Sequence, residues 1–263
     1  LWAVGTGFAA THRALTGERG RDIFSSPATG IRTLAGNAVL GSLLTIYGAV
    51  LLALLVGSAS GVWPFPRFLP EAWSPAAWQS VWGSTATLRA TLTLALASTT
   101  LALVWAVAWL ERAPPAWDKA MRWPLYLPLL LPSVLWVVGL HRVALVTGHT
   151  ASWAALIMAH TLAVVPYIVI ALSPAYLGFD ARYAQISASL GRSYWAFLLR
   201  VKWPMLRASI CSAAAVGVAV SVAQYLPTLY VGEGRFSTVT TEAVTLASGG
   251  QRSLVAAYAW LQW

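Results

Sequence analysis

Charged side chains are scarce in this chain of 263 residues. Only 10% of the residues are Asp, Glu, Lys or Arg, whereas soluble domains carry about 25%. This deficit excludes an ordinary soluble globular domain. Hydrophobic residues make up 58% of the chain, and apolar runs of about 20 residues, the length that crosses the hydrocarbon core of a bilayer as a helix, recur along it. The sequence therefore predicts an all-α fold, a polytopic transmembrane helix bundle.

Cysteine is nearly absent, since Cys211 is the one cysteine and lies inside an apolar run. An internal disulfide and a cysteine metal cluster are therefore excluded. The histidines fall in different segments, and no two of them stand at ligand spacing on one helix. They are His12, His141, His149 and His160. We expect no metal site and no cofactor bound by this chain.

Acidic residues are missing from the predicted membrane spans. All eight lie outside them: Glu18, Asp22, Glu71, Glu111, Asp118, Asp180, Glu233 and Glu242. A transporter driven by a proton or sodium gradient usually keeps an ionisable residue within the bilayer to hold the coupling ion. An ion-driven secondary transporter or channel is therefore an alternative that the sequence does not favour. The ATP-binding pattern G-x-x-x-x-G-K-[ST] is absent as well.

The net charge of +9 raises the question of nucleic acid. Binding a polyanion requires the basic groups to gather on one face or in one tract. Here they lie in short blocks between apolar runs, as in the cytoplasmic loops of a membrane protein. We therefore expect no nucleic-acid partner.

The hydrophobic runs predict about six helices, of which the last is cut off. The spans lie at roughly 34–56, 86–110, 123–146, 152–174 and 206–231, and another begins near Leu254. We expect two parts. Residues 1–33 form the end of a preceding segment plus a basic linker, and residues 34–263 form the transmembrane domain with a loop at about 176–204.

Lys and Arg predict the orientation of these helices. The connections 11–33, 111–122 and 176–207 hold twelve of them, whereas the alternate connections hold four. The first set, including residues 11–33, is therefore expected in the cytoplasm. Arg89 is expected to anchor the outer end of the second span, because an Arg at mid-membrane costs about 2.5–3.5 kcal/mol.

The loop contains the stretch "ISASLGRSYWAFLLRVKWP", residues 186–204. Gly191 can end one helix in a left-handed conformation, and Ser193 can cap the next. That second helix, from Tyr194 to about Trp203, is too short to cross a bilayer. It is apolar nearly all round, so more than one side must be covered. Either a partner covers the free side, or the helix lies in the lipid interface with Arg192, Arg200 and Lys202 toward phosphate.

The spacing of this loop resembles that of bacterial ABC-importer permeases. Their pattern is E-A-A, three residues, Gly, nine residues and I-x-L-P. Here Gly191 is followed by nine residues and then by Val201-Lys202-Trp203-Pro204, while Gln185-Ile186-Ser187 stands in place of E-A-A. The segment "SVAQYLPTLYVGEGRFSTVTTEAVTLASGG" is similar to fused, double-length permeases of the ferric-iron and thiamine type.

The resemblance implies a transport subunit of the bacterial inner membrane that is not itself an enzyme. In such permeases the helix after the glycine is a coupling helix, seated on a cytoplasmic ABC ATPase present in two copies, which bind ATP and Mg. The other implied partners are a second permease half, fused N-terminally, a periplasmic substrate-binding protein and membrane lipid. The implied coupling residues are Gln185, Gly191, Ser193, Tyr194, Trp195, Phe197, Arg200 and Pro204.

Polar groups inside the spans are candidates for a translocation path. Gln224 and Tyr225 precede Pro227, which lacks a backbone donor and tends to kink a helix, so a carbonyl becomes available. Ser221 and His160 are further candidates. The alternative role for Gln224 and His160 is a hydrogen bond between helices.

A membrane serine protease is a further alternative. It needs a histidine within the membrane and a G-x-S-G-like nucleophile turn. His160 would supply the first, but the nearest match to the turn, "GSASG" at residues 57–61, has Ala59 where the serine should stand.

Overall fold

The computed structural model describes residues 27–61, 63, 67, 70–113 and 115–262. It divides into two units, Leu1–Leu51 and Leu52–Trp263. The described part of the first unit is helical and belongs to α2 (Pro27–Ser58). Within α2, Gly36–Ser58 is long and apolar enough to cross a membrane. Residues 1–26 lie outside the described residues, so the predicted stub, basic linker and boundary near residue 33 stay predictions.

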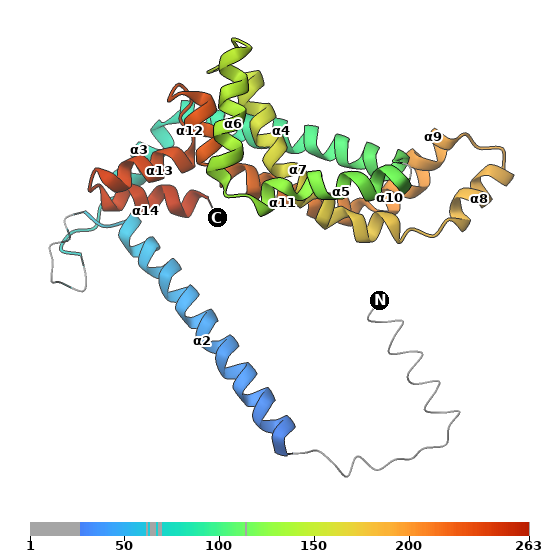
Figure 1. Cartoon of the computed structure of the whole chain (residues 1–263). Coiled ribbons are helices and arrows are strands. Elements are labelled where there is room, and N and C mark those ends of the chain that lie inside the picture. Colours follow the sequence, from blue (N-terminus) through green and yellow to red (C-terminus); the bar gives the residue numbers. More distant parts are fainter. Residues whose placement is uncertain (1–26, 62, 64–66, 68–69, 114, 263) are drawn as a thin grey trace. The chain divides into compact units, whose positions relative to one another are not determined.

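Three helices form the centre of the second unit: α4 (Thr85–Arg112), α7 (Trp153–Leu177) and α11 (Arg207–Val222). They pack side by side (Figure 1). Alanines on α4 and α11, Ala102, Ala106 and Ala213, are fully buried against the aliphatic face of α7. Small residues let membrane helices approach closely. The described residues form no strand, which confirms the predicted all-α class.

Short helices gather at the two ends of this core (Figure 1). At one end lie α3 (Ala76–Gly83), α13 (Val239–Ser248) and α14 (Arg252–Leu261), which share a small apolar cluster around Val81 and Tyr258. At the other end lie α8 (Arg182–Ser189) and α9 (Tyr194–Phe197). The sequence predicts the first group outside and the second in the cytoplasm, and α14 is the helix expected near Leu254.

Two predicted spans are broken, which corrects the sequence reading. The span at 123–146 consists of the second half of α5 (Pro115–Leu130) and of α6 (Ser133–Val146), and the segment Trp123–Leu130 meets α6 at 112°. Pro132 explains the break, because proline cannot donate a helical hydrogen bond and disfavours the α conformation in the residue before it. The span at 206–231 consists of α11 and α12 (Leu226–Gly232), separated by residues 223–225.

The described residues therefore contain fewer straight spans than expected. Three helices are long and apolar enough to cross a membrane, or up to five spans if each of two bent pairs is counted as one. One such pair is α5 with α6. The other joins the loop helix Tyr194–Met205 to α11 at 74°.

Gly217 on α11 provides a test of this packing. A Cβ there would lie 2.8 Å from Thr99 Cγ2 and 2.9 Å from Ile168 Cδ1. Replacing Gly217 with Val should therefore separate α11 from α4 and α7, and we expect a loss of about 1–3 kcal/mol, typical of overpacking. Thermal unfolding in detergent would measure it. Gly139→Val on α6 is the matched control, since nothing lies within 4 Å of its Cβ position. Equal melting temperatures of the two variants would contradict the packing.

Candidate functional site

The loop between α7 and α11 begins with a tightly closed helix end. After α8, Gly191 has φ of +68°, the left-handed conformation predicted for it. The amide of Gly191 donates to Ala188 O at 2.9 Å, and that of Arg192 donates to Ser187 O at 3.0 Å. This pair of bonds is the Schellman motif. Ser193 then caps α9, because its Oγ accepts from the Ala196 amide, as predicted.

The second helix of the loop runs through Tyr194–Met205 with a widened turn. It consists of α9, a π-helical turn η1 (Leu198–Lys202) and α10 (Trp203–Met205). In the π turn the Trp203 amide bonds Leu198 O, five residues back. Pro204 lacks the amide hydrogen that the carbonyl of Arg200 would accept in a regular helix, which favours this wider turn. The extra residue shifts the register of Lys202 and Trp203 relative to α9.

One face of this loop helix packs onto the core. Phe197 and Leu198 are buried, and the Phe197 ring lies 6.2 Å from that of Phe179, just after α7. Trp203 is half-buried beside the α4–α7–α11 cluster. Phe197 is thus the buried member of the implied coupling residues, and its coupling role stays a prediction. Phe197 fixes the loop helix to the bundle.

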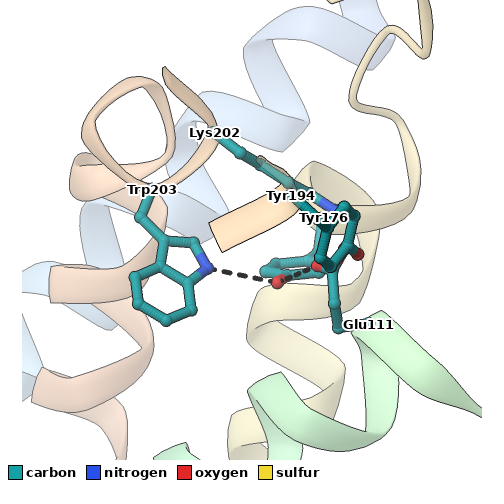
Figure 2. A network of polar contacts seen from close by, with 5 residues as sticks. All are labelled: Glu111, Tyr176, Tyr194, Lys202 and Trp203. Atoms are coloured by element: carbon teal, nitrogen blue, oxygen red, sulfur yellow. Dashed lines mark hydrogen bonds and ion pairs between the residues drawn. The ribbon is translucent and has the colours of Figure 1, made fainter. Parts of the chain in front are cut away.

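A polar network lies beneath the same face (Figure 2). Glu111, in the last turn of α4, accepts an ion pair from Lys202 at 2.7 Å between Oε2 and Nζ. The hydroxyl groups of Tyr176 on α7 and Tyr194 on α9 also donate to this carboxylate. Trp203 Nε1 donates to the Tyr176 hydroxyl at 3.3 Å. The Lys202 ammonium also lies 4.1 Å from the centre of the Tyr176 ring.

The network joins the end of α4, the end of α7 and the loop helix through one carboxylate. The side chains of Lys202 and Glu111 are only 12% and 9% exposed. A pair this sheltered is expensive to separate, because either charge alone would be left poorly solvated. Lys202 therefore points into the bundle, and the interfacial reading that aims it at lipid phosphate is wrong for this residue.

The opposite face of the loop is apolar and open. Leu190, Trp195 and Leu199 are 72%, 56% and 58% exposed. The guanidinium of Arg112 stands 5.8 Å from the Trp195 ring, which supports the side of that indole nearest α4. The remaining implied coupling residues, Gln185, Arg200 and Pro204, are also exposed.

Glu111 and Tyr176 belong to this site but were not predicted from the sequence. They are 91 and 27 residues from their partners Lys202 and Trp203, so no spacing connects them. The available signal was chemical: an acid directly after a long apolar run requires a partner if it is buried. Which cation or hydroxyl becomes the partner of this acid depends on how the helices pack.

The four predicted path residues fall into two environments. Gln224 and Tyr225 are half-buried in the break between α11 and α12. His160 and Ser221 are only 1% and 2% exposed and lie between packed helices. His160 Nδ1 is 2.9 Å from Ser221 Oγ, and Nε2 is 3.0 Å from Thr228 Oγ1. His160 therefore forms hydrogen bonds between helices, which was the alternative role that the sequence analysis gave for this residue.

The Ser221–His160 pair does not support the serine-protease alternative. The two groups are within hydrogen-bond reach, as a nucleophile and its base would be. Both are enclosed, however, and the other ring nitrogen is occupied by a threonine rather than by an orienting carboxylate. A peptide substrate could not reach this serine. Among the residues that the structure describes, no three His, Cys, Asp or Glu side chains gather as metal ligands.

The structure thus defines a helical membrane protein in which the short, mostly apolar loop helix is attached to one end of the bundle. Over 168 residues, or 64% of its length, the chain is 41% identical to the inner membrane ABC transporter permease protein YnjC of Escherichia coli (strain K12). The aligned segment is 32% of that relative, so the chain spans about a third of its length. No family model matches the chain. The similarity confirms the resemblance to ABC transporter permeases and the multi-pass inner-membrane location.

The Glu111 network yields a test of the attachment. Replacing Glu111 with Gln removes the negative charge while keeping the shape, so Lys202 is left in a sheltered position without its counter-charge. We expect the free energy of local opening of residues 194–205 to fall by about 1–3 kcal/mol. Hydrogen exchange of the loop amides in detergent measures it.

The matched control is Glu71→Gln. Glu71 pairs with Arg67 at the surface, where the side chains are 39% and 63% exposed. Such an exposed pair contributes little, so this variant should leave exchange in the loop unchanged. If Glu111→Gln also left it unchanged, the network would not hold the loop helix.

Proposed function

We propose that this chain is the membrane-spanning permease subunit of an ATP-driven ABC importer. It moves a small solute, delivered by a periplasmic binding protein, across the inner membrane. The observation that carries the proposal is the loop helix 194–205, which is tied to the bundle on one face and apolar and open on the other. The similarity to an ABC transporter permease supports the same role.

Coupling requires the loop helix to transmit movement rather than absorb it. A helix attached only by flexible connections would move without the bundle. Here Glu111 joins Lys202 and Tyr194 of the loop helix to the ends of α4 and α7. A displacement applied to the open face is therefore passed directly to two central helices. This is how an ATPase that closes on ATP would move the permease.

The apolar side chains of the open face are more favourably buried in a groove of a partner protein than exposed to water. Trp195 and Leu199 are one helical turn apart on the exposed side, and aromatic side chains supply much of the energy of protein interfaces. Exposed basic residues nearby, Arg192 and Arg200, can surround the apolar contact. The proposed partner is a cytoplasmic ABC ATPase in two copies, each of which binds ATP and Mg. A second permease half, fused N-terminally, completes the proposed complex.

This proposal predicts a selective loss of ATPase binding. In a Trp195→Asp, Leu199→Asp double variant, two charges would be buried in the contact without partners, which costs several kcal/mol. The permease should still insert and fold, because both side chains are exposed. Co-purification of the proposed partner ATPase, after co-expression, should fall at least about tenfold.

Two controls separate this contact from misfolding. Trp82→Asp changes a tryptophan that is 59% exposed at the opposite end of the core, and it should leave co-purification intact. Phe197→Asp places a charge in the buried face and should lower the melting temperature. Undiminished ATPase capture by the double variant would refute the coupling role. Uptake into vesicles without ATPase, driven by an ion gradient alone, would favour the secondary-transporter alternative.

A further inference from the structure

The break between α11 and α12 is bridged by a side chain from a third helix. α11 ends at Val222 and α12 begins at Leu226. His160 on α7 contacts Ser221 on one side of the break and Thr228 on the other, at 2.9 and 3.0 Å. The imidazole therefore forms a second connection between the two helix segments, in addition to residues 223–225.

The backbone alone holds this break weakly. Pro227 has no amide hydrogen, so the carbonyl of Ala223 lacks the donor that a continuous helix would supply. Tyr225 O does accept from the Leu229 amide at 2.9 Å, but that bond lies within the second segment. The Gln224 amide still donates to Ser221 O at 3.2 Å, so side-chain contacts with neighbouring helices add to this bond in setting the angle between α11 and α12.

The hydrogen atoms of the network can be assigned from its geometry. The Thr228 hydroxyl donates to Gln224 O at 2.9 Å, so it must accept from His160 Nε2–H. His160 Nδ1 is then an acceptor and receives the Ser221 hydroxyl hydrogen. Ser98 Oγ on α4, at 3.0 Å, donates to Ser221 or to Leu94 O. A neutral imidazole thus satisfies both contacts of His160, which join α7 to α11 and α12, and the Ser98 hydroxyl brings α4 within hydrogen-bond distance of Ser221.

We infer that His160 is a positioning residue that holds α11 and α12 at a fixed angle. Through Thr228 it also fixes the carbonyl of Gln224, which lies inside the break. Gln224 and Tyr225 are the half-buried residues of that break, so we infer that the bridge also fixes how they face the proposed solute path. This last step rests on the proposed transport function, whereas the bridge itself does not.

Thiol labelling in the break tests the bridge directly. The background is Cys211→Ala, which removes the native cysteine, combined with Gln224→Cys as the reporter. Thr228→Val keeps the shape of the side chain but removes the hydroxyl. The rate of labelling by a small charged maleimide, measured on the full chain in detergent, should rise about three- to fivefold, the effect of one interhelical hydrogen bond.

Two further variants exclude a general loss of stability. Thr228→Ser restores a hydroxyl and should return the rate to that of the background. Thr161→Val is the matched control, because Thr161 is buried next to His160 but donates to Ile157 O of its own helix. It should leave the rate unchanged. Adding His160→Ala to Thr228→Val should bring little further increase, since both break the same bridge.

The inference is overturned if Thr228→Val and Thr161→Val label at the same rate, or if Thr228→Ser fails to restore protection. Because labelling needs neither ATPase nor solute, it reports on the break between α11 and α12 independently of transport. A wild-type complex that transports no solute with ATP would refute the proposed function and leave the labelling result standing.

Discussion

The Glu111 carboxylate, at the end of α4, is the group on which the attachment of the loop helix depends. A charge sheltered from water must be paired, and Lys202 together with two tyrosine hydroxyls meets this requirement. Because these partners come from the loop helix and from α7, satisfying one carboxylate brings three segments together. The loop helix thereby becomes an extension of the core, and its remaining apolar face is left for another surface.

The same requirement operates in the centre of the bundle. Ser98, Ser221, Thr228 and His160 are all buried, and each finds its hydrogen-bond partner on another helix or on a nearby carbonyl. These bonds lie on both sides of the break between α11 and α12, where the regular backbone hydrogen bonds of a continuous helix are missing. Tyr176 of the loop network lies at the C-terminal end of α7, and His160 of the break network lies in its N-terminal half, so two separate parts of this helix carry polar contacts to its neighbours.

Sequence reasoning succeeded where the signal is local. The second and fourth spans, the left-handed Gly191 and the Ser193 cap depend on neighbouring residues, and the structure confirms them. It failed where the signal is not local. The spans at 123–146 and 206–231 were predicted from hydropathy, which does not report a bend. Pro132 and Pro227 mark where each span can break, but the angle at each break depends on how the helices pack. The inward direction of Phe197 and Lys202 depends on the π turn and on partners far away in the chain.

Composition and pattern by themselves determined that the protein is an all-α membrane bundle with a short apolar helix between two of its spans. They did so because the length of an apolar run and the chemistry of a helix cap are properties of adjacent residues. Only the tertiary structure decided that Glu111 meets Lys202, that His160 bridges Ser221 and Thr228, and which face of the loop helix is open. These outcomes depend on how helices pack, since a buried polar group accepts whichever partner the packing brings within reach.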